Sequence, residues 1–210
     1  AMLKKEFNFL EPFSTAMGSM KFNNSETRVK CFGVDSSNNP IASKNVEVLF
    51  YNSEDDFAIK LKTKEGEEVI LYKTTGEDKS FEENYEEVKK KQSSYSGKTT
   101  FGKEDMLKIP FIKVNDEINY DELCGREIKN SNYYIKQALQ TIDFELNNVG
   151  GSVKSEAVID ATQKAWTEKS RKMIFDSDFI LYLKEEGKEQ PYFALKVDNT
   201  DILLEEGEQY

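Results

Sequence analysis

The side chains that could do chemistry are mostly carboxylates, because the 210 residues include 39 Asp and Glu but no histidine. Without histidine there can be no Ser-His-Asp or Cys-His nucleophilic site, no histidine proton shuttle and no histidine-ligated zinc. Pairs of carboxylates remain as the available chemistry, since two such groups can hold a divalent cation or act as acid and base.

Two acidic clusters have spacing of this kind, Asp176-Ser177-Asp178 and Glu54-Asp55-Asp56. On an extended strand the two carboxylates of the first cluster share a face, but the turn and the bidentate Glu of a calcium loop are missing. The alternative interpretations are a polar strand edge and a hairpin tip. A Gly-rich phosphate-binding loop is also missing from the sequence. We predict no catalytic residue, no metal site and no cofactor, and keep a carboxylate-based hydrolase as an alternative.

The two cysteines, Cys31 and Cys124, lie far apart and form no CxxC pattern. Free cysteines usually behave as small buried side chains, so two semi-buried thiols are predicted, with a disulfide between them left open.

The composition argues against two classes of partner. There are 29 Lys and Arg against 39 Asp and Glu, a net charge of −10, which argues against nucleic acid or an anionic membrane. A hydrophobic fraction of 38%, with 14 Phe and 10 Tyr, is enough for a core. No run approaches the roughly 18 apolar residues of a membrane span. Ala1 before Met2 is typical of a cloning remnant, so the natural protein is expected to begin upstream.

The first half of the chain predicts strands and one helix. Strands are expected at 28–34, 46–51, 57–62 and 68–72, the last three as an antiparallel meander with a turn at 64–67. In 57–62, apolar and polar residues alternate, which indicates one solvated face. Ser80-Phe81-Glu82-Glu83 has the pattern of a capping box, and the helix it opens is expected to reach Gln92.

The second half predicts more strands. We expect a strand at 106–114 that bends at Pro110, a short helix at 120–127 with Leu123 and Cys124 inward, and a helix-to-strand change near Gln140. An amphipathic helix is possible within 152–172, and strands are expected at 173–183 and 191–197. No linker or repeat divides the chain. The prediction is a single α+β domain over 1–210, with mostly antiparallel β-sheets and a few helices.

Several motifs, in order along the chain, resemble the C-terminal half of the serpin family. They are Glu11-Pro12-Phe13, Leu107-Lys108-Ile109-Pro110-Phe111, Tyr120-Asp121-Glu122-Leu123, the stretch 144–152 that resembles the serpin hinge, the stretch 175–183 with a Phe, three variable residues and a second Phe before an apolar run, and the final-strand motif 191–197.

The resemblance implies a protein that traps serine or cysteine proteinases. In serpins the proteinase cleaves an exposed loop, which then enters a sheet as an extra strand. The loop corresponds to 152–172, and the hinge to Val149, Gly150, Gly151, Ser152, Lys154 and Glu156. Lys169, Arg171 and Lys172 are the residues after which a trypsin-like enzyme would cut. The partner is then a proteinase or another protein, and the location extracellular or at the cell surface.

The hinge departs from the family pattern, in which small alanine-like residues follow the glycine. Val149 stands where an acidic residue is usual, and the loop is short and helix-prone. Lys154 and Glu156 share one face of an inserted strand, and if that face is buried both charges need partners there. These departures put inhibition in question. The alternative is a non-catalytic extracellular or surface interaction module.

Overall fold

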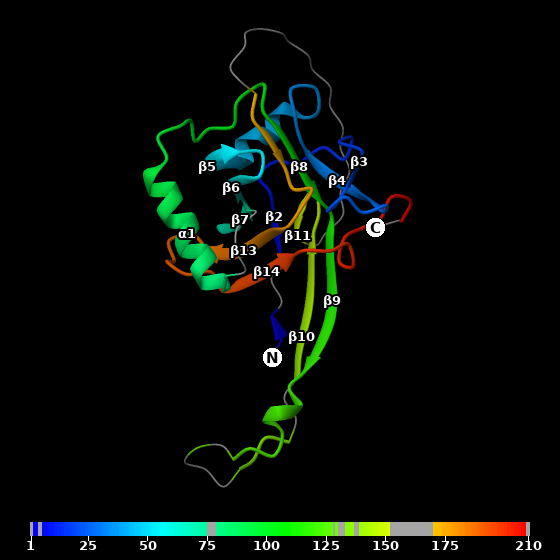
Figure 1. The fold of residues 1–210 in the computed structure, drawn as a ribbon, viewed down its shortest axis with the longest axis vertical. Coiled ribbons are helices and arrows are strands. Elements are labelled where there is room, and N and C mark those ends of the chain that lie inside the picture. The colour runs from blue at the N-terminus through cyan, green and yellow to red at the C-terminus, as the bar shows by residue number, and fades with distance from the viewer. Residues whose placement is uncertain are drawn as a thin grey trace.

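The structure of the chain is a computed structural model, which describes residues 2–3, 6–74, 79–127, 129, 133–136, 139–151 and 170–208. Within these residues, four β-sheets and one α-helix form a rounded body from which a long two-stranded arm projects (Figure 1). The α+β class with mostly antiparallel sheets is confirmed. None of the described helices is long and apolar enough to cross a membrane.

The largest sheet has five antiparallel strands in the order β14-β13-β7-β6-β5. Their bounds are β5 (Val46–Ser53), β6 (Asp56–Lys62), β7 (Glu67–Lys73), β13 (Phe179–Glu185) and β14 (Phe193–Val197). The predicted meander of β5, β6 and β7 is confirmed, and Gly66 supplies the positive φ (+80°) that the β6–β7 turn requires. The predicted strand at 173–183 is wrong in one respect, because β13 begins only at Phe179.

A four-stranded sheet has the order β12-β8-β4-β3. It comprises β3 (Ser19–Lys21), β4 (Arg28–Val34), β8 (Met106–Pro110) and β12 (Lys172–Ile174), and β12 runs parallel to β8. The single strand predicted at 106–114 is two strands. Pro110 ends β8, and the chain bends at Phe111 into β9 (Ile112–Asn119). Proline has no amide hydrogen to continue a ladder, which accounts for the break at this position.

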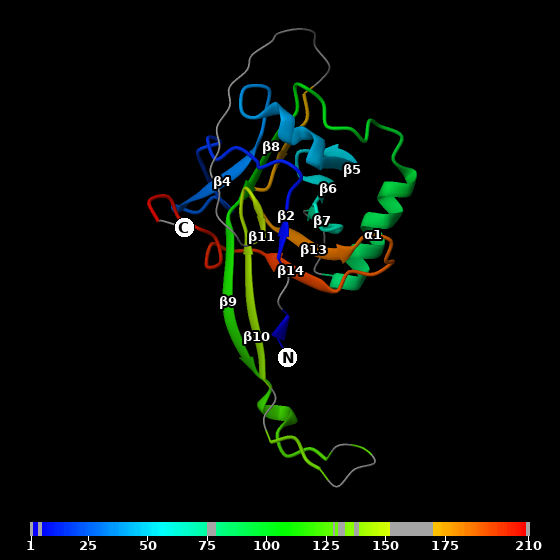
Figure 2. The ribbon, with the colours of Figure 1, turned by 180° about the vertical axis from the view of Figure 1, so that it is seen from behind.

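The arm consists of β9 and β10 (Leu139–Leu146), with β1 (Met2–Leu3) parallel to β10 (Figure 2). Directly opposed residues share a face in an antiparallel ladder. One face therefore carries Ile112 with Leu146 and Val114 with Phe144, whereas Lys113 and Glu145 form an ion pair of 3.4 Å on the other face. At these positions, next to the body, the arm has one apolar and one polar face.

Two predictions for the end of the arm are wrong. The helix expected at 120–127 is only a 3-10 turn, η2 (Asp121–Leu123), with no buried residue, and Cys124 is exposed. Of the helix-to-strand change expected near Gln140, the strand is present as β10 from Leu139, but no helix forms at Tyr134, which pairs with Glu127 as an antiparallel β-bridge. Tyr133 and Tyr134 at this end of the arm are exposed.

Helix α1 (Phe81–Ser94) packs on one face of the five-stranded sheet. The capping box is confirmed: the Ser80 hydroxyl accepts from the Glu83 amide at 3.2 Å, and the Ser80 amide donates to Glu83 Oε2 at 2.9 Å. Tyr85 and Val88 are buried against the sheet. Ala58 packs in the same cluster and is therefore buried, although it lies on the face of β6 that was predicted to be solvated. The predicted solvated face of β6 is thus partly covered.

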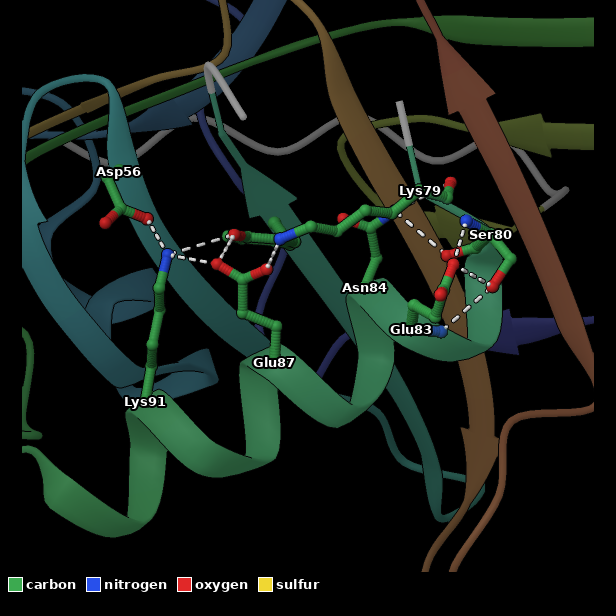
Figure 3. Close-up of polar contacts among 8 residues, drawn as sticks. Asp56, Lys79, Ser80, Glu83, Asn84, Glu87 and Lys91 are labelled. Carbon is green, nitrogen blue, oxygen red and sulfur yellow. Dashed lines mark hydrogen bonds and ion pairs between the residues drawn. The ribbon is translucent and has the colours of Figure 1, made fainter. Parts of the chain in front are cut away.

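Charged residues tie α1 to the ends of the strands beneath it (Figure 3). Glu87 accepts from Lys79 at 2.6 Å and pairs with Lys91 at 2.8 Å, and Lys91 reaches Asp56 at 2.8 Å. The hydrogen bonds from Lys79 and Lys91 lower the pKa of Glu87 to about 2. This network of ion pairs attaches the helix to the sheet.

The main core lies between the five-stranded and four-stranded sheets and contains most of the buried phenylalanines. Phe32 of β4 is fully buried in this core, with ring centroids 5.1 Å from Phe111 and 5.8 Å from Phe13. Edge-to-face and tilted contacts of this kind stabilise beyond the area that the rings bury.

Candidate functional site

The candidate site is the tight turn that follows β10. β10 ends at Leu146, and the buried side chain of Asn147 then accepts hydrogen bonds from the amides of Val149 (2.9 Å) and Gly150 (3.1 Å). The Asn147 amide donates in turn to the Gly150 carbonyl at 2.9 Å. An asparagine that bonds to amides two and three residues ahead reverses the chain locally. The chain therefore turns back beside β10.

After the turn, β11 (Gly150–Gly151) pairs antiparallel with β2 (Phe7–Asn8), with Gly150 opposite Asn8 and Gly151 opposite Phe7. The two strands lie side by side in both views of the ribbon (Figures 1 and 2). The chain beyond β10 thus begins an additional strand along β2.

Both glycines are required by this close approach. Gly150 has a φ of +146°, and a Cβ on it would overlap the Phe7 carbonyl. A Cβ on Gly151 would lie 2.9 Å from the ring of Phe7, which is itself only 1% exposed. Neither position tolerates a side chain unless β2 moves, which explains the glycine pair physically.

The turn is also joined to the segment after β2. The Phe9 amide donates to the Val149 carbonyl at 2.7 Å, and the Phe13 amide donates to the Asn148 carbonyl at 2.8 Å. Val149, predicted as a hinge residue, therefore contributes its backbone to the attachment. The sequence signal for this reversal was the pair of turn-forming residues before the glycines, Asn147 and Asn148. The hydrogen bonds that their side chains make were not predicted.

The far end of the predicted loop is fixed by a buried ion pair. Arg171, 13% exposed, donates from Nη2 to Asp105 Oδ2 at 2.6 Å and from its backbone amide to Asp105 Oδ1 at 3.0 Å. Its guanidinium also donates to the carbonyls of Lys98 and Thr100, at 2.5 and 2.7 Å. Burial opposes both charges, but these hydrogen bonds outweigh it, so the pKa of Asp105 is lowered and that of Arg171 raised.

These placements separate the predicted site residues. The structure brings Val149, Gly150 and Gly151 together against β2, whereas Ser152, Lys154, Glu156 and Lys169 lie outside the described residues. The amphipathic helix predicted within 152–172 falls largely in the same undescribed segment. Arg171 is enclosed by its ion pair and Lys172 begins β12. Asp105, which anchors Arg171, had no recognisable signal in the sequence.

The acidic clusters are used for structural contacts. Asp176 accepts from the buried Lys73 at 2.6 Å, and Asp178 accepts from the Asn23 side chain at 2.6 Å. Asp55 Oδ1 lies 3.4 Å from Lys73 Nζ. Glu54 and Asp55 form the turn between β5 and β6, which agrees with the interpretation of 54–56 as a hairpin tip. Among the described residues, no group of three or more Cys, Asp or Glu side chains is arranged to hold a metal ion.

The two cysteines are free in the structure, so the disulfide left open by the sequence is not formed. Cys31 is buried, as predicted, and its thiol donates to the Gly18 carbonyl at 3.1 Å. Cys124 is exposed, which contradicts the prediction of a semi-buried thiol.

Comparison with solved structures shows the serpin fold. The chain is similar to Serpin48 from the insect Tenebrio molitor (TM-score 0.58, 15% identity, 91% of this chain and 52% of that chain). It is similar to a serpin from the trematode Schistosoma haematobium (0.61, 15%, 94% and 55%) and to thyroxine-binding globulin in complex with thyroxine (0.59, 12%, 92% and 54%).

The chain spans about half the length of the serpins it matches. The predicted resemblance to half of a serpin is confirmed at the level of the fold. No protein-family model and no curated protein matches the sequence.

Proposed function

We propose that residues 1–210 form part of a serpin-like protein, extracellular or at the cell surface, that inhibits a serine or cysteine proteinase through a loop over 152–170. The observation that carries this proposal is β11, which starts an antiparallel strand on β2 directly after β10. A loop that enters the sheet as an extra strand begins at such a position and in this direction.

The register of β11 assigns faces to the residues that would follow it. Gly151 is opposite Phe7, whose side chain is buried, so the next residue continues opposite the exposed Glu6. Because side chains alternate between the faces of a strand, Val153, Ser155 and Ala157 would occupy the buried face of an inserted strand. Ser152, Lys154 and Glu156 would occupy the exposed face.

This assignment removes the objection raised by the two charges. Lys154 and Glu156 would need buried partners only if their face were covered, and the register supports a solvated position for both. The residues assigned to the buried face are small or apolar, as entry into a packed sheet requires.

Insertion would have to separate β1 from β10. These strands are paired over only two positions, Met2 with Thr141 and Leu3 with Ile142. A new strand between them would gain hydrogen bonds on both of its edges, which supports insertion as the energetically favoured outcome once the loop has been cut.

A matched pair of variants tests the proposal. The protein is incubated with trypsin-like and subtilisin-like proteinases, and SDS-stable complex and the thermal midpoint after nicking are measured. We expect a covalent complex and a raised midpoint, both lost in Val153→Arg and both retained in Ser152→Arg. The opposite result for the two variants would refute the register, and cleavage without any complex would refute inhibition.

The second candidate is a non-inhibitory interaction module with the same fold. Val149 in place of the family's acidic residue favours it, and thyroxine-binding globulin is among the similar structures. A thermal midpoint unchanged by nicking, together with no covalent complex, would favour this candidate.

A further inference from the structure

A hollow of about 820 Å³ lies beside the four-stranded sheet, between the β3–β4 connection and the β12–β13 connection. Asn23 and Asn24 line it on one side, Asp176 and Asp178 on another, and Lys108 of β8 also lines it. Its volume is in the range of small-ligand sites in proteins. None of its lining residues belongs to the turn after β10, so an inference about it does not rest on the proposed inhibition.

Asn23 connects two sides of the hollow through hydrogen bonds. Its backbone amide donates to the Asp176 carbonyl at 2.8 Å, and its side-chain amide donates to Asp178 Oδ1 at 2.6 Å and to the Asp198 carbonyl at 2.8 Å. Asn23 and Asn24 both have positive φ, +49° and +57°, a conformation that asparagine tolerates better than most residues. The walls are therefore preorganised by the protein itself.

Lys73 neutralises carboxylates at the hollow. Its side chain is 3% exposed, and Nζ donates to Asp176 Oδ1 at 2.6 Å and to the Ile174 carbonyl at 3.0 Å. The same Nζ lies 3.4 Å from Asp55 Oδ1. Asp176 and Asp55 thus already have a cation, which leaves them poorly suited to bind a second one.

Lys108 and Lys21, which also line the hollow, have no such partner among the described residues. Lys108 is opposite Ile174 in the parallel ladder, so both lie on the same face of the sheet, and Ile174 lines the hollow too. Within the described part of the chain, the ammonium groups of Lys108 and Lys21 make no ion pair or hydrogen bond. Lys108 is only partly exposed. Because carboxylates outnumber lysines and arginines in this protein of net charge −10, a lysine with no carboxylate partner among the described residues is unexpected.

We propose that this hollow binds a small hydroxylated organic anion, whose phosphate or carboxylate pairs with Lys108. Lysine binds such oxyanions as a point charge. The carboxylate of Asp178 and the side chains of Asn24 and Ser177 supply acceptors and donors for hydroxyl groups on the same ligand. Lys21 adds a second positive charge beside it.

The experiment is calorimetric titration of the protein with glucose 6-phosphate and with gluconate, and with glucose as the neutral probe. We expect saturable binding of at least one anion, no binding of glucose, and affinity at least about tenfold weaker in Lys108→Met, the change expected when one hydrogen bond between charged groups is lost. Lys44→Met, at an exposed lysine of the 3-10 turn η1 (Pro40–Asn45), is the matched control and should bind as the unchanged protein does.

Amide chemical shifts supply a second readout in the unchanged protein. The bound anion should shift the amides of Ile174 and Ser177, which line the hollow. No saturable binding of either anion, equal binding by Lys108→Met, or shifts confined to other regions would each overturn the proposal.

Discussion

Replacement of Asp105 by alanine should destabilise the protein far more than loss of an exposed charge. The Asp105 side chain is 6% exposed and accepts from the Arg171 amide, Nε and Nη2, and from the Gly102 amide. Its removal leaves a largely enclosed guanidinium, 13% exposed, without a counter-charge. Such a change costs about 3–5 kcal/mol in other proteins.

The cost here should fall at the lower end of that range, at about 3 kcal/mol. The reason is that the carbonyls of Lys98 and Thr100 still accept from the Arg171 guanidinium in the variant. For a chain of this size, that loss lowers the thermal midpoint by about 6–12 °C.

The assay is urea unfolding followed by circular dichroism, with Glu54→Ala as the control. Glu54 pairs with Lys172, the residue next to Arg171, at 3.7 Å, and both side chains are more than half exposed. An exposed pair of this kind contributes about 0.5 kcal/mol or less. If Asp105→Ala destabilises the protein no more than Glu54→Ala does, the reasoning about the buried pair is refuted.

Two further predictions concern the helix and the cysteines. Because the pKa of Glu87 is lowered from 4.5 to about 2, its contribution to the free energy of unfolding is complete above pH 4.5 and is lost as the pH falls toward 2. Urea unfolding should show Glu87→Gln less stable by about 1 kcal/mol at pH 7 and by less at pH 3, and a difference independent of pH would contradict this. A thiol reagent should label Cys124 in the folded protein but Cys31 only after unfolding, because burial raises the pKa of the Cys31 thiol; rapid labelling of both would disprove the assigned burial.

The elements with local signals were predictable from the sequence. The capping box at Ser80 and Glu83 is made within a few residues, and the alternation in β6 reflects a strand with one face toward the core. The short apolar runs after Pro110 and around Tyr134 were misread. Apolar spacing does not show which neighbour will cover a residue, and at the end of the arm Tyr133 and Tyr134 are largely exposed.

The candidate site was predictable only in part. The glycine pair and the asparagines before it indicate a turn, because these residue types tolerate the required backbone. The face on which Lys154 and Glu156 would fall depends on the position opposite Phe7, a residue more than 140 positions away in the sequence. A shift of one residue in that register reverses every face, so no local pattern can decide it.

By itself, the sequence determined the residue types available: no histidine, an excess of carboxylates, and small residues after β10. The tertiary structure decided which of these groups meet. It placed Asp105 against Arg171, Lys73 against Asp176 and β11 against β2, and it left Lys108 beside a hollow without an ion pair to any described residue. The physical reason is that burial and counter-charges come from strands distant in sequence, whose pairing is set by packing of the whole core.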